Sequence, residues 1–221
     1  MAEIVSLDAS WDERIAALPG AHLLQTVEWA QVKANVGWKA TPMLWRDENE
    51  SIAAAAMVLT RTMRLLQMGP KVSVCYVPRG PMLDWGDHGL QMRVFSDLLD
   101  FARRQKALFL KIDPELKLGI GVPGTEGAVE DVIGQQVLEE MKTSGWHFSN
   151  SQVQFRNTVL LDLAGSEEDW LKCMKQKTRY NLRLAQRSGM IVRAANESEL
   201  PQIYKMYAET SVRDGFVILS E

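Results

Sequence analysis

Residues 166–189, SEEDWLKCMKQKTRYNLRLAQRSG, are the most informative stretch of this chain, and they predict a helix. Ser166 is a good N-cap residue, three acidic residues follow it at the positive end of the helix dipole, and Gly189 is placed to end the helix. Side chains that recur at intervals of three or four residues predict a buried stripe, formed by Trp170, Met174, Thr178, Leu182 and Ala185.

A second face of this predicted helix is basic. It carries Lys175, Arg179, Arg183 and Arg187 at every fourth position, and no acidic residue follows Asp169 within the stretch. Guanidinium groups match phosphate oxygens in pairs, so the face is a candidate anion-binding site. A solvated helix face is the alternative. The missing acidic partners favour ligand recognition, and the candidate ligand-binding residues here are Lys177, Arg179, Tyr180 and Arg183.

Composition limits the function classes. The chain has 221 residues, 46% of them hydrophobic, and a net charge of −3, which argues against a protein that coats nucleic acid generally. The two cysteines form no CxxC motif and the three histidines are scattered, so neither a disulfide framework nor a metal site is expected. The N-terminus does not read as a signal peptide, and the longest apolar run, 52–59, is too short to cross a bilayer. The expected location is the cytoplasm.

The predicted elements indicate a mixed α/β fold with a domain boundary near residue 150. Ser10 and Glu13 predict a capping box for the first helix, and Thr26 is the predicted cap of the second. The predicted helices are 10–18, 26–37, 87–106, 129–144, 166–189 and 197–214. The predicted strands are 38–46, 51–61, 65–68, 72–77, 107–112 (central and buried), 152–163 and 190–194.

Five stretches resemble, in order, the Fem family of peptidoglycan interpeptide-bridge aminoacyltransferases (FemA, FemB and FemX-like proteins). They are QTVEWAQVKANVGW (25–38), VCYVPRGPMLDW (74–85), LKIDP (110–114), KQKTRYNLRLAQRSGMIVR (175–193) and YKMYAETSVRDGF (204–216). The resemblance implies a first GNAT-like domain (acyl-CoA N-acyltransferase fold) over 1–150 and the N-terminal part of a second over 151–221. Fem chains continue well beyond this point, so the second domain is expected to be completed by further residues or by a partner.

The resemblance also implies a reaction and partners. An amino acid would pass from aminoacyl-tRNA to the side-chain amine of a peptidoglycan precursor, either the UDP-linked pentapeptide or lipid II. Contact with a membrane would arise only through the lipid-linked substrate, and no DNA partner, metal or cofactor is implied. The alternatives are an acyl-CoA-dependent N-acyltransferase and a non-catalytic module that binds RNA or another anion. The chain lacks the [QR]-x-x-G-x-[GA] loop that holds CoA, which counts against the first.

Site residues follow from the same resemblance. Lys33 matches a lysine that lies against the precursor's phosphates, so Lys33, Arg179 and Arg183 are expected to hold the diphosphate. Asp84 falls near a carboxylate proposed to assist catalysis, although a turn or cap before the 87–106 helix is an alternative role. No residue is a clear general base. The remaining predicted substrate-binding residues are Tyr76 and Arg79 at a strand end, together with Tyr207 and Arg213. Tyr207 and Arg213 are expected to line a cleft between domains. The alternative for Arg213 is that it only complements the dipole of its helix.

Overall fold

The computed structural model describes residues 1–64 and 69–218, so the predicted strand at 65–68 lies outside the described residues. The chain divides into two compact units, Met1–Asn157 and Thr158–Glu221. The division lies close to the predicted boundary. Whether the second unit begins a second GNAT-like domain stays a prediction.

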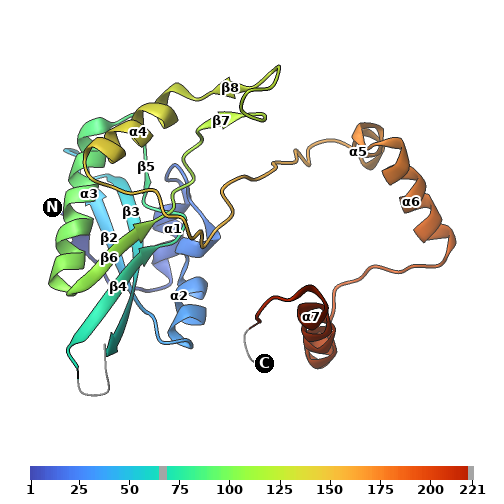
Figure 1. Ribbon diagram of the computed structural model, residues 1–221, viewed down its shortest axis with the longest axis horizontal. Helices are drawn as coiled ribbons and strands as arrows, with labels where there is room; N and C mark the ends of the chain where they lie inside the picture. The colour runs from blue at the N-terminus through green and yellow to red at the C-terminus, as the bar shows by residue number, and fades with distance from the viewer. Residues whose placement is uncertain (65–68, 219–221) are drawn as a thin grey trace. The chain divides into compact units, whose positions relative to one another are not determined.

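The first unit is built on a mixed sheet (Figure 1). Its strand order is β1-β2-β3-β4-β6, and the short β5 pairs with β3 beside this path. The pairs along β1 to β4 are antiparallel, whereas β6 runs parallel to β4. The strands are β1 (Glu3–Ile4), β2 (Lys39–Arg46), β3 (Ile52–Arg64), β4 (Lys71–Val77), β5 (Met82–Leu83) and β6 (Ala107–Ile112). The mixed-sheet α/β class, with the element order that predicted a GNAT-like domain, is confirmed.

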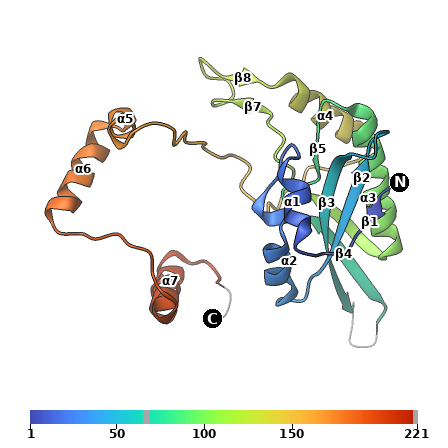
Figure 2. The same cartoon turned by 180° about the vertical axis from the view of Figure 1, so that it is seen from behind.

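Helices cover both faces of this sheet. One core cluster joins one sheet face to α3 (His88–Arg104) through the apolar residues Leu90, Val94, Leu98, Phe101 and Ala102. The other cluster joins the opposite face to α1 (Ser10–Ala16) and α2 (Val27–Ala34) through Trp11, Ile15 and Ala30. Figures 1 and 2 show α3 on one side of the sheet and α1 and α2 on the other. The remaining elements are the 3-10 helix η1 (Leu23–Gln25), a hairpin of β7 (Gly119–Ile120) and β8 (Val129–Glu130), and α4 (Val132–Thr143).

Short-range capping signals set most helix starts correctly. The Thr26 side chain accepts a hydrogen bond from the Trp29 backbone N–H (3.4 Å), and Asp87 accepts one from Leu90 (2.9 Å). The predicted capping box of Ser10 is wrong. Ser10 lies inside α1, and its backbone N–H donates to the carboxylate of Asp8 (2.9 Å), so the capping group comes from two residues upstream.

Three further predictions for the first unit are corrected. Within the described residues β6 is an edge strand rather than a central one, and its Leu108 and Phe109 side chains are 61% and 55% exposed. Val129–Glu130 forms β8 instead of the first turn of α4, because it pairs with β7. Of the apolar residues that the predicted 26–37 helix would turn toward the core, Ala30 is buried as expected, whereas Val32 and Val36 are exposed.

The second unit consists of short helices: α5 (Glu167–Cys173), α6 (Gln176–Arg187), the 3-10 helix η2 (Glu197–Glu199) and α7 (Leu200–Asp214). The single predicted helix 166–189 is therefore wrong, because Met174 and Lys175 have extended backbone between α5 and α6. The capping box of Ser166 with Asp169 is confirmed. No strand forms over 152–163 or 190–194 in the described residues, since a strand is stable only when a neighbouring strand pairs with it.

Burial in the second unit also differs from the predicted pattern. The stripe expected on 166–189 is largely exposed, as are the apolar side chains of α7, Leu200, Ile203, Met206 and Tyr207. These apolar faces have no sheet to pack against within the described part of the unit. Along the described residues of both units, no helix combines the length and the apolar character needed to cross a membrane.

Candidate functional site

The candidate site lies where β4 and β6 end side by side. The two strands are parallel and Val77 is paired with Ile112, so the residues that follow them emerge at the same edge of the sheet. Parallel strands in α/β proteins present ligand-binding residues at this carboxyl edge. Here β4 is followed by Pro78, Arg79 and Gly80, and β6 is followed by Asp113.

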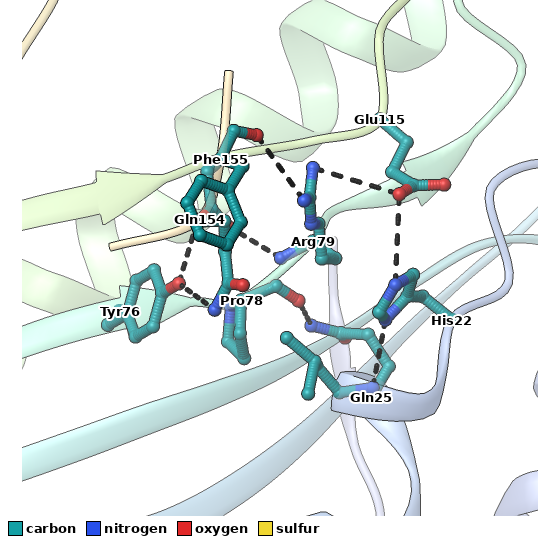
Figure 3. A network of polar contacts seen from close by, with 10 residues as sticks. His22, Gln25, Tyr76, Pro78, Arg79, Glu115, Gln154 and Phe155 are labelled. Atoms are coloured by element: carbon teal, nitrogen blue, oxygen red, sulfur yellow. Dashed lines mark hydrogen bonds and ion pairs between the residues drawn. The ribbon is translucent and has the colours of Figure 1, made fainter. Parts of the chain in front are cut away.

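A buried glutamine shapes the loop after β4. β3 pairs with β4 at Leu59 and with β5 at Ala55. Between these two positions of β3, the backbone N–H of Met57 donates a hydrogen bond to Gln25 Oε1 (2.6 Å). The Nε2 atom of Gln25 donates to the carbonyl of Pro78, as Figure 3 shows. Its backbone carbonyl accepts from Trp11 Nε1 (2.7 Å). Gln25 is fully buried and therefore fixes the loop against the sheet.

Gly80 is required by this close packing. A Cβ atom on Gly80 would lie 2.9 Å from Val77 Cγ1 and 3.0 Å from Gln25 Nε2. Val77 is held in β4 and Gln25 is held by its hydrogen bonds, so neither side chain can move aside for a Cβ atom. The glycine of the sequence VPRGP is thus explained by space rather than by a positive φ angle.

Asp113 ties the two strand ends together. Its Oδ2 accepts a hydrogen bond from the Tyr76 hydroxyl (2.7 Å), and its Oδ1 accepts one from the backbone N–H of Arg79 (2.6 Å). The second bond holds Arg79 at a φ of +49°, in the left-handed region that non-glycine residues rarely adopt. The carboxylate therefore sets both the direction of the Tyr76 hydroxyl and the backbone from which the Arg79 side chain departs.

The pKa values of both members of this pair are raised. Burial raises the pKa of Asp113, and the hydrogen bond from Tyr76 opposes that rise without cancelling it. Burial, followed by the hydrogen bond to Asp113, raises the pKa of Tyr76 well above its usual value. Tyr76 therefore keeps its proton at physiological pH, and its hydroxyl donates a hydrogen bond to Asp113.

The Arg79 guanidinium has donors to spare. Nη2 donates to the backbone carbonyl of Phe155 (3.4 Å), and Nη1 lies 3.7 Å from the Glu115 carboxylate, which also lies 3.7 Å from His22 Nε2 (Figure 3). Nε is buried and has no hydrogen-bond partner in the described part of the chain. An arginine that is 18% exposed and so incompletely paired can accept a further anionic or carbonyl ligand.

Two other predicted site residues of the first unit have different surroundings. The Lys33 ammonium lies 4.7 Å from the centre of the Trp29 ring, so the lysine is partly buried by a cation–π contact. Asp84 is exposed, and its carboxylate accepts the backbone N–H of Gly86 (2.8 Å) while its carbonyl accepts that of Asp87 (3.1 Å). Its turn role ahead of α3 is thus present, and its catalytic role stays a prediction.

In the second unit the predicted basic residues do not act alike. Arg179 Nη1 donates to the carbonyls of Leu171 (3.3 Å), Lys172 (3.1 Å) and Met174 (2.5 Å), so it caps the C-terminal end of α5. Lys177, Tyr180 and Arg183 are exposed on α6.

The two predicted residues of α7 have neighbours of their own. Tyr207 packs against Phe216 with ring centres 5.6 Å apart, and Arg213 pairs with Asp214 (2.8 Å). Among residues 1–64 and 69–218 no group of acidic, histidine or cysteine side chains is arranged to hold a metal ion.

Sequence reasoning found Tyr76 and Arg79 but missed Asp113 and Gln25. Asp113 had a usable signal, because it stands directly after an apolar run with strand character and before Pro114, at the end where parallel strands carry ligands. Gln25 had none, because its partners Met57 and Pro78 are distant in the sequence.

Comparison with known proteins gives a consistent result. The model of the FemAB family matches residues 10–221. The lipid II:glycine glycyltransferase of Staphylococcus haemolyticus is 24% identical over 208 residues, covering 93% of this chain and 46% of that protein. The protein of the same name from Staphylococcus saprophyticus is 23% identical over 212 residues, covering 95% of this chain and 48% of that protein. This chain thus spans about half the length of these relatives.

A solved structure shares the fold. The crystal structure of FemX matches this structure with a TM-score of 0.75 and 20% sequence identity, covering 100% of this chain and 52% of that chain. A likeness at this identity supports the fold, while the match to the family model covers nearly all of the sequence. The chain belongs to the FemAB family.

Proposed function

We propose that this protein transfers an amino acid from aminoacyl-tRNA to the side-chain amine of the stem peptide in a peptidoglycan precursor. The observation that carries the proposal is the FemAB match over residues 10–221, together with relatives named as lipid II:glycine glycyltransferases. The precursor is either the UDP-linked pentapeptide or lipid II. The chain spans about half the length of those relatives.

The chemistry is attack of an amine on an activated ester. The donor ester is already reactive, so the protein contributes mainly by positioning the two substrates and by stabilising the tetrahedral oxyanion. Arg79 supports this proposal because its buried Nε has no partner in the described residues and its Nη atoms make only long contacts. A guanidinium in that condition can donate to an oxyanion or a carbonyl oxygen.

The phosphates of the precursor are assigned to basic residues. Lys33 in the first unit and Lys177 and Arg183 in the second have charges available to a diphosphate. Arg179 is assigned a different task, since its guanidinium already caps α5. Tyr180, Tyr207 and Arg213 remain candidate substrate contacts, as does Asp84 for catalysis.

A direct assay tests the proposal. Charged tRNA is incubated with the UDP-linked pentapeptide or with lipid II, in the presence of this chain or of a chain extended at its C-terminus, and transfer is followed by mass spectrometry. Transfer to the side-chain amine is the expected result. RNA binding that falls steeply with salt, without transfer by the extended chain, would instead favour a non-catalytic RNA-binding role. Protection by acetyl-CoA against thermal unfolding would favour a CoA-dependent acyltransferase.

Two arginines of α6 are expected to respond differently to the same substitution. Arg183→Gln should raise the KM for the precursor about tenfold, the value of one charge-assisted hydrogen bond, and leave helix content unchanged. Arg179→Gln should lower helix content, because the carbonyls at the end of α5 lose their donor, at a cost of about 1 kcal/mol. Circular dichroism and steady-state kinetics measure the two effects. Equal KM changes with unchanged helix content would contradict the distinction.

A further inference from the structure

The Tyr76 hydroxyl has a fixed hydrogen-bond direction. Its proton points to Asp113 Oδ2 (2.7 Å), so the lone pairs of its oxygen are left to accept a hydrogen bond from elsewhere. Asp113 Oδ1 is occupied by the Arg79 backbone N–H, which keeps the carboxylate from turning away. The hydroxyl is therefore presented as an acceptor, and the group that fits it is an N–H donor.

The chain itself already places such a donor there. Gln154 Nε2 lies 3.5 Å from the Tyr76 oxygen, a long hydrogen bond, and Figure 3 shows the two side chains next to each other. Tyr76 is only 8% exposed, so little other access to the hydroxyl is left while Gln154 is in place. A long bond to a neutral amide is weaker than a short one to a charged amine, so a substrate amine can replace it.

The surrounding charges favour a cation at this position. Asp113 is half-buried, and burial strengthens its attraction for a positive group nearby. The neighbouring Lys111 ammonium donates to Ser149 Oγ (3.3 Å) and to the Ser151 carbonyl, and the Arg79 side chain is directed to Glu115 and Phe155. Neither cation is hydrogen-bonded to the Asp113 carboxylate through its side chain. Both cations still favour the ionised form of Asp113 through their charges, and the direct hydrogen-bonding positions around Tyr76 and Asp113 are left for a bound amine.

We propose that the Tyr76 oxygen receives the amine nitrogen of the acceptor substrate, that Asp113 is the positioning residue which makes Tyr76 an acceptor, and that Gln154 occupies this place in the free protein. The inference rests on the proposed function and adds the location of the attacking group. After the ammonium has lost one proton to solvent, the neutral amine would donate one N–H to Tyr76 and attack the ester carbonyl with its lone pair. The new N–C bond forms as the ester C–O bond breaks, and the ribose oxygen of the tRNA leaves with the second proton that the nitrogen loses.

The test compares two peptides in each protein. One is the UDP-linked pentapeptide with its side-chain amine, and the other carries a methyl group in place of that amine. Isothermal titration calorimetry is performed on the C-terminally extended protein. The unmodified protein should bind the amine peptide about tenfold more tightly than the methyl peptide. In Tyr76→Phe this ratio should fall to about two or less. Because both affinities are measured on the same protein, a folding defect cancels in the ratio.

A second pair of variants tests the role of Gln154. Gln154→Ala should bind the amine peptide more tightly, about threefold, because the weak hydrogen bond that competes with the amine is gone. Gln152→Ala is the matched control, since Gln152 bonds to Ser149 rather than to Tyr76, and it should leave the affinity unchanged. A tenfold ratio that persists in Tyr76→Phe would overturn this inference and leave the proposed function intact. Failure of the unmodified protein to bind either peptide would overturn both.

Discussion

Replacement of Gln25 by leucine is expected to lower the free energy of unfolding by about 4 kcal/mol. Leucine has a similar size, so the cavity changes little. The backbone N–H of Met57 and the carbonyl of Pro78 would both lose their partner inside the protein. Each buried polar group without a partner costs about 1–3 kcal/mol, and Gln25 is fully buried, so water cannot easily replace the amide. Urea unfolding followed by tryptophan fluorescence measures the loss.

Gln91→Leu is the matched control for this prediction. Gln91 is also buried, on the α3 side of the sheet, but its side chain makes one hydrogen bond, to the carbonyl of Trp85 (2.6 Å). Its replacement should cost about half as much as that of Gln25. Equal losses in the two variants would show that the bridge from Gln25 to both Met57 and Pro78 is not what stabilises the loop after β4.

The sequence predicts the first unit well where the signal is local. The cap at Thr26 and the helix predicted over 87–106 both depend on residues within a few positions of one another, and both are confirmed. The same holds for β2, β3 and β4, whose hydrophobic runs are joined by short connections. Here local propensity and the final packing agree, as is expected of a sequence with little conflict between them.

The errors arise where the outcome depends on a distant partner. The residues 152–163 have strand composition, but no strand forms there in the described residues, because composition cannot supply the neighbouring strand. The break between α5 and α6 is also not visible in the periodicity. At this break Arg179 donates to three backbone carbonyls, although its spacing and the family resemblance had assigned this side chain to a ligand.

The candidate site was predictable to the same degree. Tyr76 and Arg79 follow from their place at the end of a strand in a stretch that resembles the Fem family. Asp113 contacts both of them across the sheet, at sequence separations of 37 and 34 residues. Only the parallel pairing of β4 with β6 brings these residues together. A sequence pattern can suggest this pairing, but it cannot specify which oxygen accepts from which donor.

The second large effect is expected for Asp113→Asn, which should lower kcat/KM for amine transfer by about 30-fold. The asparagine oxygen can still accept the Arg79 N–H, but its amide group would face Tyr76 as a donor. The Tyr76 hydroxyl would then accept from the asparagine and point its own proton outward. Stability should change by less than about 1 kcal/mol, since both contacts survive with one reversed in direction.

Asp97→Asn is the control for this substitution. Asp97 is also partly buried, and its Oδ2 accepts from an aromatic donor, Trp45 Nε1 (2.9 Å), on the α3 side of the sheet. Its replacement should leave kcat/KM unchanged. Equal losses of activity in the two variants would indicate a general packing effect rather than a reversal at Tyr76.

The pH dependence separates the role of Asp113 in activity from its role in stability. Because burial raises the pKa of Asp113 in the folded protein, this group contributes stability that is fully present below the ordinary aspartate pKa. That contribution is lost as the pH rises through the raised pKa. Activity should instead increase as the pH rises, because only the ionised carboxylate makes Tyr76 a hydrogen-bond acceptor. A protonated Asp113 would donate to the Tyr76 hydroxyl and turn its proton outward, as asparagine does.

As the pH rises through the range just above the ordinary aspartate pKa, the activity of the unmodified protein should therefore increase. Over the same range its free energy of unfolding should decrease, because the stabilising contribution of Asp113 is lost. Both changes should be absent from Asp113→Asn, because asparagine does not titrate. The measurements are kcat/KM for transfer and urea midpoints in the same buffers. An acid limb of activity that persists in Asp113→Asn would assign the titration to another group. If that variant also kept its rate, the direction of the Tyr76 hydroxyl would have no part in binding the amine.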